Sequence, residues 1–317
     1  MKKLLTLTLI LFCLSAFAAD KKHIGISQIV AHPALDAVQK GIIDTVRGCG
    51  YKNADFDVQL AGGNMVTANQ IAANFIGAKK DLVVGIATPT ALALAGAYTK
   101  ASPNTPVIFS AVTDPVGAKL VRDIYKPGGQ ITGVSDLAPI DTQFQLIFDL
   151  GIKAKTVGII YNAGEQNSRS QLALAQKAAK ARGVKLVERA IINSADVASA
   201  ANSLVGKVQA IYITTDNTVV SALEALIKVA NAHKIPLIMS DTDSVKRGAL
   251  AARGFDYYKH GVQTGQMVCR ILKGSKTAIT PVEFQHDLKL SLNMKAAKII
   301  GIKFPDGLVK AADEIIK

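Results

Sequence analysis

Two stretches of the sequence read almost alike: residues 105–114 are TPVIFSAVTD and residues 235–243 are IPLIMSDTD. In each, a proline precedes a short apolar run with the length of a buried strand, and a Thr-Asp pair follows shortly after it. Earlier in each half, a similar run at 82–86 or 210–214 is followed by a polar loop and an Ala/Leu-rich segment. One α/β unit is therefore used twice, which predicts two similar lobes.

Short β-branched runs alternate with amphipathic segments of helical length from residue 24 onward. This alternation is typical of parallel sheets whose strands are joined by helices, and 317 residues are enough for two such sheets. We expect strands at 24–27, 57–60, 82–86, 107–111, 131–134, 156–161, 185–190, 210–214, 237–240 and 249–255. We expect helices at 34–47, 66–76, 90–99, 142–150, 170–182, 197–205, 219–232 and 260–272.

The first residues have the pattern of a secretory signal peptide. Lys2 and Lys3 precede an apolar stretch at 4–14, and small residues lead up to Ala18. The apolar stretch is shorter than the roughly 20 residues that a membrane-spanning helix needs. We therefore expect residues 1–18 to be cleaved after Ala18 and the mature protein to be periplasmic.

The formal net charge is +13, from 37 basic and 24 acidic residues. The basic residues are scattered and form no run of five or more, so the sequence predicts a solvated basic surface and no nucleic-acid partner. The chain contains no Trp, and aromatic residues make up only 5% of it. A surface of stacked aromatic rings is therefore excluded.

The usual catalytic motifs are missing from the sequence. It has no Gly-rich phosphate loop, no His-Glu-x-x-His, no paired cysteine spacing and no Gly-x-Ser-x-Gly. Its five histidines are isolated, and His32 alone stands in a loop directly after a predicted strand. We therefore expect no catalytic residues, no metal and no cofactor.

Polar residues gather where the predicted strands end, which is where parallel sheets bind ligands. Helix N-termini at Thr88 and Thr113 suit a carboxylate, and Asp241 or Asp216 suits an ammonium group. Helix capping is the alternative role for many of these residues, and core packing is the alternative for Tyr161. The candidate ligand-binding residues are Ser27, Gln28, Thr88, Pro89, Thr113, Asp114, Tyr161, Asn162, Glu165, Asn167, Thr215, Asp216, Asn217 and Asp241.

Several short motifs carry a family resemblance. They include Gly25-Ile26-Ser27-Gln28, Ala87-Thr88-Pro89, Val112-Thr113-Asp114-Pro115, Gly133-Val134-Ser135-Asp136, Thr215-Asp216-Asn217-Thr218 and Gly254-Phe255-Asp256-Tyr257-Tyr258. With them the chain resembles the exported substrate-binding proteins of ABC transporters that have the type I periplasmic-binding-protein architecture. This group includes tryptophan- and tyrosine-binding members.

The resemblance implies an α/β fold of two Rossmann-like lobes, joined by three crossovers and closing by a hinge motion. Lobe 1 would comprise residues 24–136 and 257–282, and lobe 2 residues 137–256 and 283–317. It further implies that a helix ending at Cys49 and a returning helix with Cys269 share one face of the first sheet, so we predict a disulfide between them.

The resemblance also implies the function. The protein would capture an amino-acid-like ligand, by preference an aromatic one, and deliver it as a monomer to an ABC permease. Asp241 would be the first choice and Asp216 the second for the ligand's ammonium group. The alternatives are a receptor for a sugar, nucleoside or purine, a sensor subunit that serves a membrane receptor, or an exported enzyme.

Overall fold

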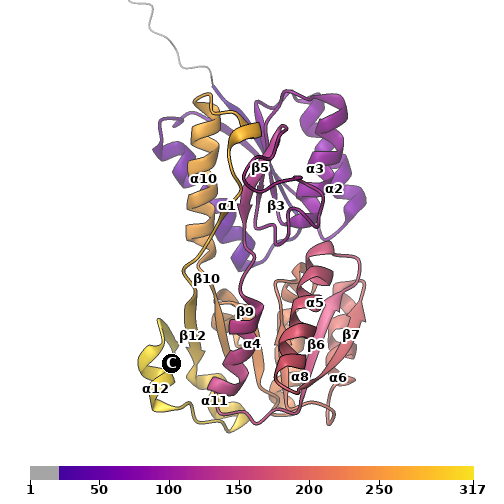
Figure 1. Ribbon diagram of the computed structural model, residues 1–317, viewed down its shortest axis with the longest axis vertical. Coiled ribbons are helices and arrows are strands. Elements are labelled where there is room, and N and C mark those ends of the chain that lie inside the picture. Colours follow the sequence, from indigo (N-terminus) through magenta and orange to yellow (C-terminus); the bar gives the residue numbers. More distant parts are fainter. Residues whose placement is uncertain (1–20) are drawn as a thin grey trace, which may run out of the picture.

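Two mostly parallel sheets, each covered by helices, form the two lobes of the protein (Figure 1). The structure is a computed structural model that describes residues 21–317, so the predicted signal peptide lies outside the described residues. The prediction of two α/β lobes is confirmed. Within residues 21–317, no helix combines the length and the apolar character needed to cross a bilayer.

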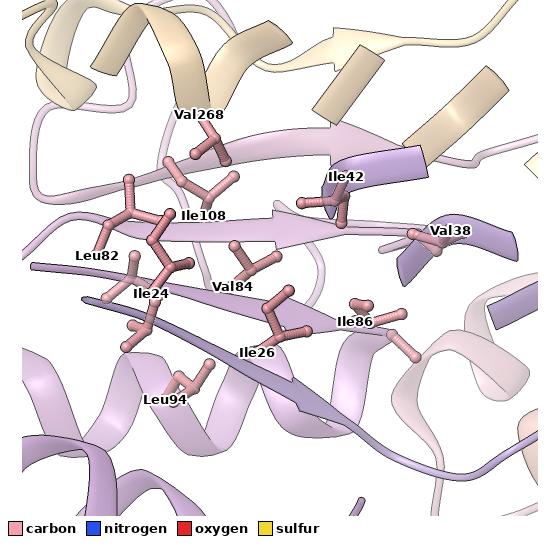
Figure 2. Close-up of a cluster of buried hydrophobic side chains, with 14 of the residues drawn as sticks. Ile24, Ile26, Val38, Ile42, Leu82, Val84, Ile86, Leu94, Ile108 and Val268 are labelled. Atoms are coloured by element: carbon pink, nitrogen blue, oxygen red, sulfur yellow. The ribbon is translucent and has the colours of Figure 1, made fainter. Parts of the chain in front are cut away.

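The first lobe has a six-stranded parallel sheet in the order β11-β5-β4-β3-β1-β2. Its strands are β1 (His23–Gln28), β2 (Asp55–Leu60), β3 (Leu82–Ile86), β4 (Val107–Ser110), β5 (Ile131–Ser135) and β11 (Glu283–Phe284). Its helices are α1 (Pro33–Gly48), α2 (Met65–Gly77), α3 (Thr88–Ala101), α10 (Tyr257–Leu272) and the short η2 (Thr277–Ile279). Strand residues such as Ile26 and Val84 pack between the helices and are fully buried (Figure 2).

The second lobe has a seven-stranded sheet in the order β13-β12-β10-β9-β8-β6-β7. Its strands are β6 (Thr156–Asn162), β7 (Lys185–Ile191), β8 (Ala210–Ile213), β9 (Leu237–Asp241), β10 (Ala251–Phe255), β12 (Lys289–Asn293) and β13 (Glu314–Ile316). Its helices are α4 (Ile140–Asp149), α5 (Gln166–Ala181), η1 (Ser194–Asp196), α6 (Val197–Asn202), α7 (Asn217–Ser221), α8 (Leu223–Ala232), α9 (Asp243–Arg247), α11 (Met294–Ile300) and α12 (Asp306–Ala311).

The structure corrects several boundaries. The sequence places residues from 283 onward in the second lobe, whereas β11 pairs with β5 of the first sheet. The helix expected at 219–232 is two helices, because Ala222 leaves the helical conformation between α7 and α8. The sheet of the second lobe is not wholly parallel, since the unpredicted strand β12 runs antiparallel to β10.

Three crossovers connect the lobes, and hydrogen bonds tie them to one another. They leave β5 at Asp136, β10 at Asp256 and β11 at Gln285. Tyr257, at the start of α10, donates its hydroxyl to Asp136 at 2.9 Å, and Gln285 donates its amide to the Asp256 carbonyl at 3.1 Å. The three segments of the hinge are therefore hydrogen-bonded to one another.

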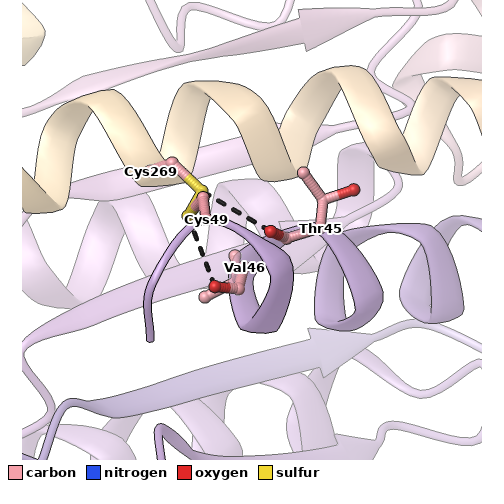
Figure 3. Close-up of a disulfide and its surroundings, with 4 residues drawn as sticks. All are labelled: Thr45, Val46, Cys49 and Cys269. Atoms are coloured by element: carbon pink, nitrogen blue, oxygen red, sulfur yellow. Dashed lines mark hydrogen bonds between the residues drawn. A yellow bond between two sulfur atoms is a disulfide. The ribbon is translucent and has the colours of Figure 1, made fainter. Parts of the chain in front are cut away.

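Helices α1 and α10 are packed so closely that no side chain fits at two glycines of their contact. A Cβ on Gly261 would lie 2.2 Å from the Val38 carbonyl oxygen, and one on Gly41 would lie 2.4 Å from the Tyr258 carbonyl oxygen. At the far end of the pair, Cys49 and Cys269 form a disulfide with their Cα atoms 6.4 Å apart (Figure 3). The predicted pairing is confirmed, and it joins residues 220 positions apart in the sequence.

Replacing both Cys49 and Cys269 with Ser should lower the free energy of unfolding by about 2–5 kcal/mol, because the closed loop is long. Thermal denaturation of the wild type and the double variant, each with and without reductant, measures the effect. The wild type should lose stability on reduction, and the double variant should not respond. Equal melting temperatures for oxidised wild type and double variant would contradict the expectation.

Candidate functional site

The carboxyl ends of both sheets meet at the cleft between the lobes, and the loops there enclose two adjoining cavities. The inner cavity has a volume of about 20 Å³ and the outer one about 440 Å³. Asn217, the first residue of α7, lines both. The inner cavity has room for a group about the size of one water molecule, whereas the outer one can hold a whole amino acid.

Ten of the fourteen predicted residues line this pair of cavities. Those in the inner cavity are Thr113, Asn167, Thr215, Asp216, Asn217 and Asp241. Those in the outer cavity are Thr88, Pro89, Asn162, Glu165 and again Asn217. The repeat in the sequence therefore located the cleft from both of its sides.

The other four predicted residues line neither cavity. Gln28 donates its amide to the Val30 carbonyl and to Asp36 at 2.7 Å, so it holds its own loop together. Asp114 accepts a hydrogen bond from Ser170 of the other lobe at 3.0 Å. Tyr161 packs against the second core, which is the alternative noted for it, and Ser27 is buried at the end of β1.

Three buried carboxylates line the inner cavity: Asp136, Asp216 and Asp241. Among the described residues, neither Lys nor Arg belongs to the lining of this cavity. Burying a carboxylate without a cation in contact costs free energy. Here hydrogen bonds and, for Asp241, the charge of Arg247 offset part of that cost. The electrostatics of the inner cavity therefore favour a positively charged group.

Asp216 is the N-cap of α7 and accepts three hydrogen bonds. Its donors are the Val219 amide at 2.9 Å, the Asn162 amide at 2.6 Å and the Ser168 hydroxyl at 2.7 Å. Burial, and secondarily the charge of Glu165, raises the pKa of Asp216 to about 7. This carboxylate therefore supports the fold of the second lobe as well as lining the cavity.

Glu165, whose charge acts on Asp216, also accepts hydrogen bonds from the start of α7. One of its oxygens accepts from the amide and the hydroxyl of Thr218, at 3.0 and 2.8 Å. The other accepts from the side-chain amides of Asn217 and Asn167, at 2.5 and 3.1 Å. Glu165 thereby fixes two amide side chains that line the inner cavity.

Asp241 ends β9, and both of its oxygens are bonded to the start of α9. Its partners are the Ser244 amide at 2.8 Å and the Ser244 hydroxyl at 2.7 Å. Burial raises the pKa of Asp241 above its usual value. Like Asp216, it faces the cavity but already stabilises a helix of its own lobe.

The inner cavity is also lined by Asp136, His32 and Tyr257, which were not among the predicted ligand-binding residues. Asp136 accepts from the Thr113 hydroxyl at 3.1 Å and from the Tyr257 hydroxyl at 2.9 Å, and burial raises its pKa. Asp136 directly follows β5, so its position after a strand was the signal that could have identified it.

His32 caps α1 and has one unused ring nitrogen. Its Nδ1 accepts from the Leu35 amide at 3.5 Å, while burial, followed by the charge of Arg247, lowers its pKa to about 4. The neutral ring therefore carries its proton on Nε2, which has no partner among the described residues. The Asn167 Oδ1 atom is also without one there. The cavity thus offers one donor and one acceptor from opposite lobes.

Comparison with known proteins agrees with this geometry. The chain is 41% identical over 286 residues to the tyrosine-binding protein of Clostridioides difficile, covering 89% of this chain and 82% of that one. It is also similar to the crystal structure of an ABC domain in complex with L-Trp from Streptococcus pneumonia. The TM-score is 0.89 at 36% identity, and the match covers 93% of this chain and 100% of the other.

A third relative has been solved without ligand and in an open form. It is the ligand-free, open structure of a substrate-binding protein with adhesive properties from Clostridium difficile, also 36% identical, with 93% of this chain and 99% of that one covered. Its TM-score is only 0.69. At equal sequence identity, the present structure is therefore less similar to this open form than to the L-Trp complex.

The family described as ABC transporter substrate binding protein matches residues 23–316, nearly all of the described chain. Together with the two lobes, the cleft between them and the relatives, this match establishes that the chain belongs to the substrate-binding proteins of ABC transporters.

Proposed function

We propose that the protein binds an amino acid, by preference an aromatic one, in the cleft and presents it to the permease of an ABC transporter. It acts as a monomer in the periplasm and catalyses no reaction. The observation that carries the ligand class is the inner cavity, where three carboxylates meet and no Lys or Arg of the described chain belongs to the lining. An ammonium group supplies the missing positive charge.

The outer cavity supplies the complementary site for a carboxylate. Helix α3 begins there at Thr88, its preceding residue Ala87 gives no side-chain cap, and the buried Thr88 hydroxyl has no partner among the described residues. The N-terminus of a helix attracts anions through its free amides and its dipole. The two ends of the cleft therefore match the two charges of an amino acid.

The wall of the outer cavity on the first lobe is apolar. It is formed by Ile29, Val30, Met65, Pro89 and Leu92. The opposite wall, from the second lobe, is mostly polar and includes Arg169 and Asn193. An aromatic side chain would lie against the apolar wall, in keeping with the tyrosine-binding relative and the relative solved with L-Trp.

Titration with L-Trp tests this ligand class directly, because the chain has no Trp of its own and fluorescence excited near 295 nm reports the ligand alone. Binding should change the emission, and L-Tyr and L-Phe should compete more strongly than L-Leu. N-acetyl-L-Trp, which lacks the ammonium group, is the matched control and should not compete. A flat response to L-Trp together with no competition or heat of binding for any amino acid would contradict the proposal.

The affinity for L-Trp should fall by about tenfold or more between pH 8 and pH 5.5. The pKa of Asp216 is raised to about 7 and those of Asp136 and Asp241 are raised as well, so acid removes negative charge from the cavity while the ligand keeps its ammonium. His32, with a pKa of about 4, stays neutral over this range. Calorimetric titration at several pH values measures the trend, and an affinity independent of pH would contradict it.

A further inference from the structure

We propose that Asp136 is the carboxylate that binds the ammonium group of the ligand, and that it couples binding to lobe closure through Thr113 and Tyr257. The inference rests on the proposed function and specifies which residue makes its central contact. It replaces Asp241 and Asp216, the choices made from the sequence.

The hydrogen bonds of the three carboxylates distinguish them. Asp216 accepts three bonds within its lobe, one of them capping α7, and Asp241 accepts both of its bonds from Ser244 at the start of α9. Among the described residues, Asp136 caps no helix, and the side chains that donate to it are two hydroxyls, one on each oxygen. Each of its oxygens keeps a lone pair that can accept from a ligand.

The size and charge of the inner cavity suit this contact. Asp136 is 4% exposed, and the cavity that it lines has a volume of about 20 Å³. That space accommodates an ammonium group but not the rest of an amino acid, which belongs in the outer cavity. A ligand bound in this orientation brings a cation to the carboxylate that has the fewest bonds to amide groups.

The Thr113 hydroxyl connects Asp136 to the second lobe. Because it donates its single proton to Asp136, it can only accept from Gln171, whose Nε2 lies 3.5 Å away on α5. Gln171 also donates to the Thr215 hydroxyl at 2.8 Å and accepts from the Thr215 amide at 3.1 Å. An ionised Asp136 therefore orients a hydroxyl that bonds across the cleft.

Tyr257 connects Asp136 to the hinge. Asp136 lies on the first crossover and Tyr257 on the second, and the bond between them joins the two at 2.9 Å. An ammonium group at Asp136 thus contacts the point where two of the three connections meet. Ligand contact at this position favours one arrangement of the lobes, which is what coupling requires.

Calorimetric titration of Asp136→Asn with L-Trp and with indole-3-propionate, its analogue without the ammonium group, tests the proposal. We expect about 100-fold weaker binding of L-Trp and unchanged or tighter binding of indole-3-propionate, because the variant removes a negative charge that only the ammonium needs. Asp241→Asn is the matched comparison and should change the affinities for both ligands by a similar factor.

Equal losses for the two ligands in Asp136→Asn, or a selective loss for L-Trp in Asp241→Asn, would overturn the assignment. If Asp136→Asn fails to fold by circular dichroism, Tyr257→Phe tests the same carboxylate by removing one of its donors. In that variant a larger loss for L-Trp supports the proposal, and equal losses refute it. A wild type that binds no amino acid at all would refute the proposed function itself.

A separate measurement tests whether ligand binding is coupled to lobe closure. Thr113→Val removes the hydroxyl between Asp136 and Gln171 while leaving the carboxylate in place. Small-angle scattering should show that saturating L-Trp closes this variant less than the wild type. The same decrease in radius of gyration in both proteins would refute the role of Thr113.

Discussion

Burial of three carboxylates in one small cavity is the constraint that the rest of the cleft satisfies. Each acid is kept from water, and no Lys or Arg of the described chain lines the cavity beside it. Two of the acids are stabilised by helix N-termini, whereas the side chains of residues 21–317 that donate to the third are two hydroxyls. The cavity is thus complete as a folded structure but remains electrostatically unbalanced, and this imbalance favours a cationic group over a neutral one.

The pair of helices α1 and α10 fixes the first-lobe side of that cavity. Their N-termini bring His32 and Tyr257 to the cleft, and the glycine contacts and the disulfide hold the helices together along their length. Helix α10 directly follows the second crossover, so the packed pair of α1 and α10 begins at the hinge. A change in hinge angle therefore moves the cavity wall as one body.

Most of the fold could be predicted from the sequence because parallel strands and crossover helices produce strong periodicities. The short β11 has only two residues and no period to detect, and the antiparallel β12 lies beyond the repeated unit. In the cleft, position after a strand predicted that Asp216 and Asp241 face it, and both line the inner cavity. It did not show which way a side chain turns, so Asp114 was expected at the ligand and instead bonds to Ser170 across the lobes.

The polarity of the cleft also determines how a zwitterion can enter it. The start of α3 attracts an anion in the outer cavity, whereas the inner cavity repels one. Reversing the ligand would place a carboxylate among three others and leave the helix terminus without an anion. In the proposed binding mode the ammonium therefore lies inward, near the crossovers, and the side chain lies outward, against the apolar wall of the first lobe. This binding mode would assign recognition of the common amino-acid group and selection of the side chain to different parts of one cleft.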